Sequence, residues 1–188
     1  KKQLLSLVAL AGITSAFAQL PVSTSPENRR VVLEEYTGIH CTYCPDGHKI
    51  ANNYKSTDPD NIFLINVHTG GYANPSAGEP DFRTSFGAAL GNQTGLTGYP
   101  SGTINRHVFS GSNTALNRSA WVSSGNQIKT MPSYVNVATE ATVDVQSRIM
   151  TVDVELYFTA DANTNVNLNV ALTQDNVEGP QTGGASFY

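Results

Sequence analysis

The sequence predicts an α/β domain followed by a β-rich domain, and three observations support this prediction. Upstream of Pro132, strand-like and helix-like segments alternate around Gly-rich loops, which is typical of an α/β domain. Downstream of Pro132, apolar residues recur at every second position, as they do in half-buried strands. The only cysteines, Cys41 and Cys44, lie between an apolar run and a helix-like segment. We therefore expect a first domain over residues 30–131 and a second over residues 132–188.

The chain begins with the features of an export signal. Lys1 and Lys2 form a basic start, residues 4–17 are an apolar run too short to span a bilayer comfortably, and residues 16–18 are a small-residue cleavage site. We expect a signal peptide over residues 1–18 and a linker over residues 19–29. Because disulfides persist outside the cytosol, export favours an oxidised cysteine pair.

Composition excludes several functional classes. The formal net charge is −4 and the Lys and Arg residues are scattered, so the basic stripe needed for nucleic-acid binding is missing. After the leader, no apolar stretch is long enough for a transmembrane helix. Phosphate-binding loops and serine-hydrolase motifs are also missing from the sequence. We expect no cofactor and no nucleic-acid partner, and a protein that is at most peripherally attached to a membrane.

The first domain divides into elements in a regular order. Residues 31–36 read as a strand, and the helix that begins near the cysteines continues through residues 46–55. Residues 61–67 are a mostly apolar run of the kind found in central strands, so the unit should be parallel and right-handed. A Gly/Pro-rich loop over 68–80 follows. The remaining elements are a short helix over 82–90, a strand led by the turn at 98–105, and a helix over 115–129.

The second domain reads as an antiparallel meander with one apolar face. Its three predicted strands lie at 135–145, 150–158 and 166–172. An immunoglobulin-like sandwich would need roughly seven strands to cover such a face. We therefore expect an all-β immunoglobulin-like domain that is incomplete in this chain.

The Cys41-x-x-Cys44 pair is the strongest chemical signal. A Cys-x-x-Cys at a strand-to-helix junction is typical of thioredoxin-like folds, because the helix N-terminus favours a thiolate. Two alternatives remain open: an inert disulfide staple, and a copper or zinc site formed by Cys41, Cys44, His40 and His48. His68 or His107 could replace one of the two histidines in such a site.

Longer motifs around this pair carry a family resemblance. Glu34-Glu35-Tyr36-Thr37-Gly38 precedes Cys41-Thr42-Tyr43-Cys44-Pro45, and Gly98-Tyr99-Pro100-Ser101-Gly102-Thr103 lies downstream. Together with the β-rich C-terminal part, these motifs resemble the Omp28-related outer membrane proteins of the Bacteroidetes, within the thioredoxin-like superfamily. The resemblance is closest over residues 30–108 and looser over the remainder.

The resemblance implies a fold and a set of roles. The first domain would be an α/β thioredoxin-like domain, followed by the immunoglobulin-like sandwich. Cys41 would be the nucleophilic cysteine and Cys44 the resolving cysteine, joined as a disulfide in the oxidised protein. Pro100 would follow a cis peptide bond and lie against the disulfide, leaving the backbone of Tyr99 free to bind a substrate peptide.

Two ionisable residues complete the predicted site. Glu35 lies six residues before Cys41, where thioredoxins keep a buried carboxylate, and burial would raise its pKa so that it can relay a proton to or from Cys44. Strand alternation predicts that only one of Glu34 and Glu35 points inward, and we favour Glu35. A cationic His40 beside Cys41 would stabilise the thiolate.

These features predict an exported thiol–disulfide oxidoreductase. It would act on protein substrates or redox partners in the periplasm or at the outer membrane of a Gram-negative bacterium, with surface exposure and secretion left open. The rival hypothesis is a non-catalytic, outer-membrane-associated binding or surface protein that uses the thioredoxin fold as a scaffold.

Overall fold

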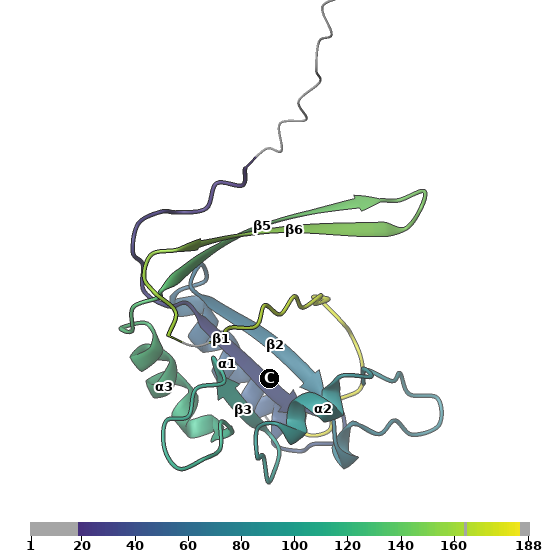
Figure 1. Ribbon diagram of the computed structural model, residues 1–188. Coiled ribbons are helices and arrows are strands. Elements are labelled where there is room, and N and C mark those ends of the chain that lie inside the picture. The colour runs from purple at the N-terminus through teal and green to yellow at the C-terminus, as the bar shows by residue number, and fades with distance from the viewer. Residues whose placement is uncertain (1–18, 164, 185–188) are drawn as a thin grey trace, which may run out of the picture.

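The computed structural model describes residues 19–163 and 165–184, so the predicted signal peptide lies outside the described residues. It is a mixed α/β structure with small sheets and a β-rich C-terminal region (Figure 1). In chain order the elements are β1 (Val31–Thr37), α1 (Cys44–Thr57), β2 (Ile62–His68), η1 (Gly71–Ala73), α2 (Gly87–Asn92), β3 (Ser101–Ile104), β4 (Leu116–Asn117), η2 (Arg118–Ala120), α3 (Trp121–Ile128), β5 (Val135–Asp144) and β6 (Ile149–Phe158).

The first sheet has four strands in the order β2-β1-β3-β4. Strand β1 runs parallel to β2, as predicted, and antiparallel to β3, and β4 continues the sheet antiparallel to β3. The central strand is therefore β1, and all of its residues except Val32 are buried. The expectation that residues 61–67 form a central strand is wrong: within the described residues β2 lies at the sheet edge, where Phe63 is exposed.

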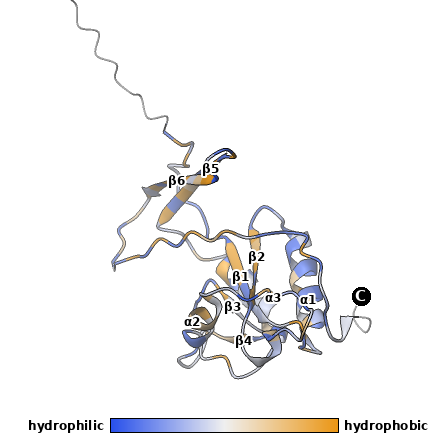
Figure 2. Ribbon diagram, turned by 90° about the vertical axis from the view of Figure 1, so that its right-hand side faces the viewer, coloured by the Kyte–Doolittle hydropathy of each residue, from blue (hydrophilic) through white to orange (hydrophobic). Residues whose placement is uncertain are grey.

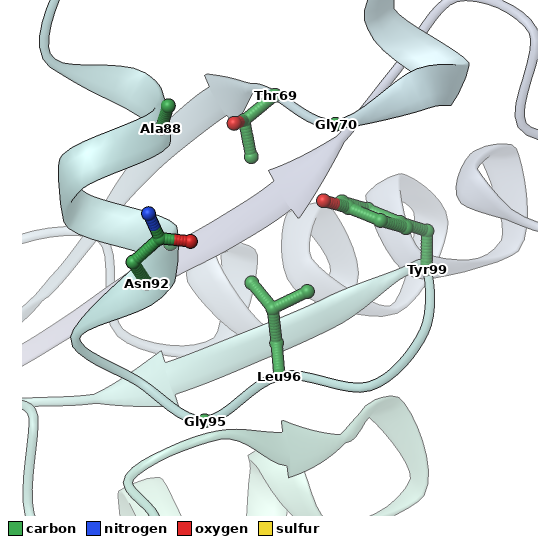
Figure 3. A pocket seen from close by; sticks show the side chains of 8 residues that line it. Thr69, Gly70, Ala88, Asn92, Gly95, Leu96 and Tyr99 are labelled. Carbon is green, nitrogen blue, oxygen red and sulfur yellow. The ribbon is translucent and has the colours of Figure 1, made fainter.

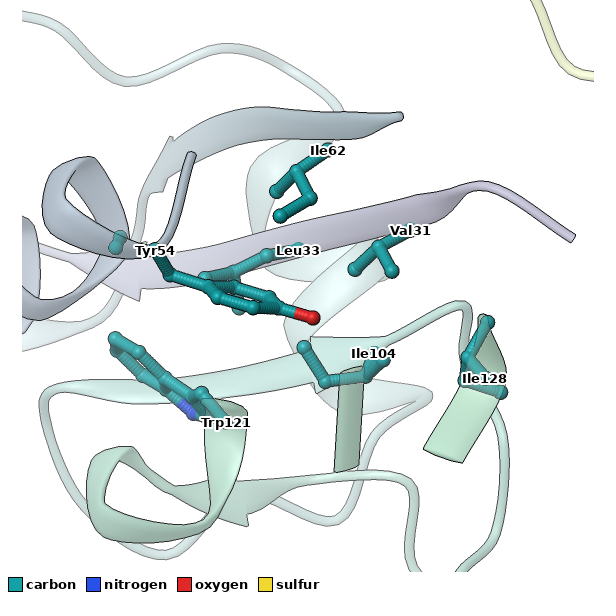
Figure 4. Close-up of a cluster of buried hydrophobic side chains, with 8 residues drawn as sticks. Val31, Leu33, Tyr54, Ile62, Ile104, Trp121 and Ile128 are labelled. Carbon is teal, nitrogen blue, oxygen red and sulfur yellow. The ribbon is translucent and has the colours of Figure 1, made fainter. Parts of the chain in front are cut away.

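One face of this sheet packs against α1 and α3 and forms the hydrophobic core (Figure 4). Residues of β1 at odd positions, such as Leu33, meet Tyr54 from α1 and Trp121 from α3. Both Leu33 and Trp121 are fully buried, and each such side chain contributes roughly 2–3 kcal/mol of burial free energy. The core fixes the start of α1, and with it the cysteines, at the end of β1.

Strands β5 and β6 form a separate antiparallel hairpin that projects from the α/β part (Figures 1 and 2). The predicted third strand at 166–172 is wrong, because these residues pair with no strand and their apolar side chains are exposed. Alternation of apolar residues signals an extended chain, but a strand also needs a partner edge. Here the chain runs past the hairpin to the cysteine loop, where the backbone N–H of Thr182 donates to the carbonyl of Ile39.

Two predicted helices have different bounds in the structure. The helix expected over 82–90 lies at Gly87–Asn92, and the helix expected over 115–129 begins only at Trp121. Leu116 and Asn117 pair with β3 instead, and the Asn117 side chain then accepts a hydrogen bond from the backbone N–H of Ser119. Short polar side chains that bond nearby backbone in this way favour caps over helix interiors.

Within the described residues, no helix combines the length and the apolar character that crossing a membrane requires.

Candidate functional site

Cys41 and Cys44 form a disulfide at the N-terminus of α1. Their Sγ atoms are bonded, and their Cα atoms lie 5.4 Å apart. Cys44 is the first residue of the helix and Pro45 the next, a position where proline's missing N–H is not needed. The helix dipole and the free N–H groups of the first turn favour negative charge on the nearby sulfur atoms once the pair is reduced.

A tight turn holds Cys41 in place. The backbone N–H of Cys41 donates to the carbonyl of Gly38 at 3.0 Å, and the N–H of His40 donates to the carbonyl of Tyr72 at 2.9 Å. A Cβ atom at Gly38 would collide with the backbone of Tyr72 and Ala73, so no other residue fits there without a shift. The Thr-Gly of the sequence motif is thus explained by the close approach of the loop after β2.

Glu35 lies on the face of β1 that meets the first turn of α1. Its carboxyl group is only 1% exposed and has no hydrogen-bond partner among the described residues. A Cβ built on Gly47 would lie 2.5 Å from its Oε1 and 3.0 Å from Pro100 Cγ. Glu35 is therefore brought together with the first turn of α1 and with Pro100, where the sequence predicted it.

His48, from the second turn of α1, is the polar neighbour of Glu35. Its Nε2 lies 3.8 Å from Glu35 Oε1 and 3.0 Å from the hydroxyl oxygen of Thr37. Burial raises the pKa of Glu35 to about 8. Burial, together with repulsion from His68, lowers the pKa of His48 to about 4. Between these values both groups are neutral, so Glu35 carries a proton at neutral pH.

Glu34 is also buried, which corrects the prediction that only one of the two glutamates points inward. It lies on the opposite face of β1, where Arg106 Nη2 donates to its Oε1 at 2.6 Å and the Thr103 hydroxyl donates to its Oε2 at 2.9 Å. A central strand is covered on both faces, so alternation separates the two carboxyl groups without exposing either one. Glu34 is thus away from the disulfide and held as an ion pair.

Pro100 is buried at the start of β3, and the Tyr99–Pro100 peptide bond is cis. The Tyr99 ring packs edge-on against Tyr72, with ring centroids 5.9 Å apart, and its hydroxyl lies over Gly70. Beside Tyr99 and Gly70, a cavity of about 260 Å³ opens toward Thr69, Asn92 and Leu96 (Figure 3). This hollow is large enough for a side chain of a bound peptide.

The structure does not gather the histidines into a metal site. His40 Nε2 lies 2.9 Å from Glu79 Oε2, His68 packs against Phe82, and His107 packs against Phe109. Across residues 19–163 and 165–184, no three His, Cys, Asp or Glu side chains converge as metal ligands. The alternative set of cysteines with His40 and His48 is therefore not assembled.

Two contacts at the cysteine loop had no signal in the sequence. The Arg118 side chain binds Asp46 in the first turn of α1, and its guanidinium lies 5.7 Å from the centroid of the exposed Tyr43 ring. On the loop itself, the Gln181 side chain donates to the carbonyls of Gly38 and Cys41. These partners are distant in sequence, so neither periodicity nor motif spacing could reveal them.

Comparison with solved structures finds a similarity to HBP35 of Porphyromonas gingivalis, with a TM-score of 0.47 and 19% identity. It covers 62% of this chain and 38% of that chain, so the chain spans well under half of the length of that protein. No curated protein matches the sequence.

A family model described as "Outer membrane protein Omp28" matches residues 87–187. The matched part includes Tyr99 and Pro100 but begins after the cysteines, whereas the sequence motifs had suggested the closest likeness over residues 30–108. Because the match covers more than half of the 188 residues, the chain belongs to the Omp28 outer membrane protein family.

Proposed function

We propose that this chain is an exported thioredoxin-like protein that exchanges disulfides with proteins of the cell envelope through Cys41 and Cys44. One observation carries the proposal: the disulfide lies at the N-terminus of α1, and the same first turn of this helix packs against the buried and unpartnered carboxyl group of Glu35. Strongly perturbed ionisable groups gather at functional sites more often than elsewhere. A cysteine pair that served only as a staple would need no buried carboxyl group beside it.

The topology supports a thioredoxin-like assignment for residues 30–131. Strands β1 and β2 are parallel and joined through α1, while β3 and β4 pair antiparallel and lead into α3. Residues 132–188 are proposed as a second unit, part of an immunoglobulin-like sandwich that begins with the β5–β6 hairpin. Membership in an outer membrane family supports an envelope location, and a signal peptide over residues 1–18 would deliver the chain there.

The exchange proceeds through a mixed disulfide. A thiolate of a substrate dithiol attacks Cys41 Sγ and forms a new S–S bond, while the Cys41–Cys44 bond breaks and its electron pair goes to Cys44 Sγ. The second substrate thiolate then attacks the substrate sulfur of the mixed disulfide, and Cys41 leaves as a thiolate. The substrate is oxidised to a disulfide and the cysteine pair is reduced by two electrons. The reverse sequence reduces a substrate disulfide.

Glu35 supplies the proton that this sequence needs. At neutral pH the carboxyl group is protonated, because burial raises its pKa to about 8. It can therefore give a proton to the Cys44 sulfur as that sulfur leaves, and it takes the proton back when the disulfide re-forms. His48, which is partly exposed, lies beside this buried carboxyl group, with its Nε2 3.8 Å from Glu35 Oε1. Tyr99 and Pro100 would dock the substrate peptide beside the disulfide.

A trapping experiment tests the proposal. In Cys44→Ala the resolving thiol is gone, so mixed disulfides through Cys41 should accumulate with envelope proteins and be released by a reductant. Cys41→Ala is the matched control, since its remaining buried thiol at position 44 should trap little. Absence of reductant-sensitive adducts with Cys44→Ala in the producing cell would refute exchange.

A second candidate is a non-catalytic binding or surface protein of the outer membrane. The observation that favours it is the burial of Cys41, which is only 2% exposed although Tyr43 in the same turn is 60% exposed. Replacing both cysteines separates the candidates. The binding-protein hypothesis expects retained location and binding, with a loss of at most about 2 kcal/mol from opening so short a loop.

A further inference from the structure

The segment 179–184 lies directly on the cysteine loop. Its Gln181 side-chain amide donates to the Cys41 carbonyl at 3.1 Å and to the Gly38 carbonyl at 3.2 Å. Between these two bonds, the backbone N–H of Thr182 donates to the carbonyl of Ile39 at 2.8 Å. Three carbonyl acceptors of the turn, those of Gly38, Ile39 and Cys41, are thus occupied by one short stretch of chain that is about 140 residues distant in sequence.

Two glycines allow this approach. Gly183 has φ +79, a backbone conformation that favours glycine, and a Cβ there would also collide with the carbonyl of Thr42. Both the backbone conformation and the lack of space therefore disfavour any other residue at this position. A Cβ at Gly179 would lie 2.5 Å from the Phe82 ring. The segment is fitted at both ends, against Phe82 on one side and against the cysteine turn on the other. We refer to residues 179–184 as the strap; it is the yellow end of the chain in Figure 1.

The strap contacts the turn that contains Cys41, one of the two cysteines of the disulfide. Cys41 is buried although it belongs to a surface turn whose next two residues, Thr42 and Tyr43, are exposed. The chain that leads to the strap, residues 165–178, is exposed throughout. A segment with few buried contacts opens at a low free-energy cost compared with the core.

We propose that the strap occupies the peptide-docking surface of the cysteine turn, and that it must leave before Cys41 can exchange with a substrate. The polypeptide that replaces it is an extended segment that donates a backbone N–H to Ile39 and side-chain amide hydrogens to the carbonyls of Gly38 and Cys41. The role of the strap in controlling exchange with substrates rests on the proposed exchange function. The gating itself is measurable with a small reductant and needs no protein substrate.

The first test is the rate at which dithiothreitol reduces the disulfide, followed by alkylation and mass measurement. Gln181→Ala removes two hydrogen bonds of about 1 kcal/mol net in total, so the open fraction and the reduction rate should rise about five- to tenfold. Gln174→Ala is the matched control, because Gln174 is exposed on the same stretch of chain and makes no hydrogen bond in the structure.

Gly183→Ala provides an independent second variant. It should accelerate reduction more strongly than Gln181→Ala, because the added Cβ cannot fit beside Thr42. Gly111→Ala is its control: Gly111 also has a positive φ, +66, but a Cβ there meets nothing within 4 Å. Wild-type reduction rates in both Gln181→Ala and Gly183→Ala would overturn the proposal.

A peptide with the sequence of residues 177–184, Val-Glu-Gly-Pro-Gln-Thr-Gly-Gly, tests the docking surface directly. Added in excess to Gly183→Ala, it should slow reduction toward the wild-type rate, and the same peptide with Ala in place of Gln should not. A peptide without effect would refute the assignment of a docking surface. Failure to trap substrates with Cys44→Ala would refute exchange while leaving these rates unchanged, so the two failures are distinguishable.

Discussion

We expect the protein to lose stability between pH 6.5 and 8, and replacing Glu35 with Gln should abolish most of this loss. In the folded protein Glu35 keeps its proton up to about pH 8, whereas the unfolded chain loses it near 4.5. Between these values the folded state binds more protons, so its free energy of unfolding falls as the pH rises. The neutral amide of Gln keeps the shape of the side chain and removes the titration.

The expected size follows from the two pKa values. Below pH 6.5 two partly buried histidines add the opposite slope, because burial lowers the pKa of His48 to about 4 and also lowers the pKa of His68 from 6.5, and the unfolded state then binds the extra protons. Above pH 6.5 the Glu35 slope stands alone. In this range each pH unit lowers the free energy of unfolding by about 1.4 kcal/mol, which gives a fall of about 2 kcal/mol between pH 6.5 and 8.

Urea unfolding of the oxidised protein measures this fall. The single tryptophan, Trp121, is fully buried and reports unfolding through its fluorescence. Wild type should lose about 2 kcal/mol over this pH interval and Glu35→Gln should lose little. Glu140→Gln, at an exposed position on β5, should follow wild type. The same pH slope in Glu35→Gln and wild type would refute the burial of a protonated carboxyl group beside the first turn of α1.

Two further predictions concern the support of the sheet. Arg106→Gln leaves the buried carboxylate of Glu34 without its cation and should lower the free energy of unfolding by about 2–3 kcal/mol in urea titrations. The control Arg83→Gln, in an exposed ion pair, should lower it by less than about 0.5 kcal/mol. Equal effects of the two substitutions would contradict this prediction. Gly102→Ala would place a Cβ 2.8 Å from the Trp121 ring. This substitution should lower the free energy of unfolding by about 1–3 kcal/mol and shift the fluorescence of Trp121. A melting temperature equal to that of wild type would contradict the close packing of Gly102 against Trp121.

Local sequence signals predicted the part of the fold that supports the site. The apolar runs of β1 and β2 and the helix after the cysteines lie where periodicity placed them, because each is long enough for its pattern to be clear. The burial of Glu35 was predicted from its spacing from Cys41, whereas strand alternation alone did not choose between Glu34 and Glu35. The burial of Glu34 was not foreseen, since the cation that compensates it, Arg106, lies 72 residues further along the chain.

The remaining errors share a physical cause: a single segment does not reveal its partner. Residues 166–172 have the alternation of a strand, but in the described structure they pair with neither of the two sheets. Strand β4 has only two residues, too few for any periodic signal. In the strap, nothing in the sequence around Gln181 indicates that its amide binds the cysteine turn.

The central claim, that the cysteine pair is exchange-competent, is tested most directly by a redox titration. The protein is equilibrated in thiol–disulfide buffers, and alkylated Cys41 and Cys44 are counted by mass at each potential. We predict a reversible two-electron transition between about −120 and −270 mV, the range of exchange catalysts. A disulfide that stays closed below about −300 mV would identify a structural staple and contradict the claim.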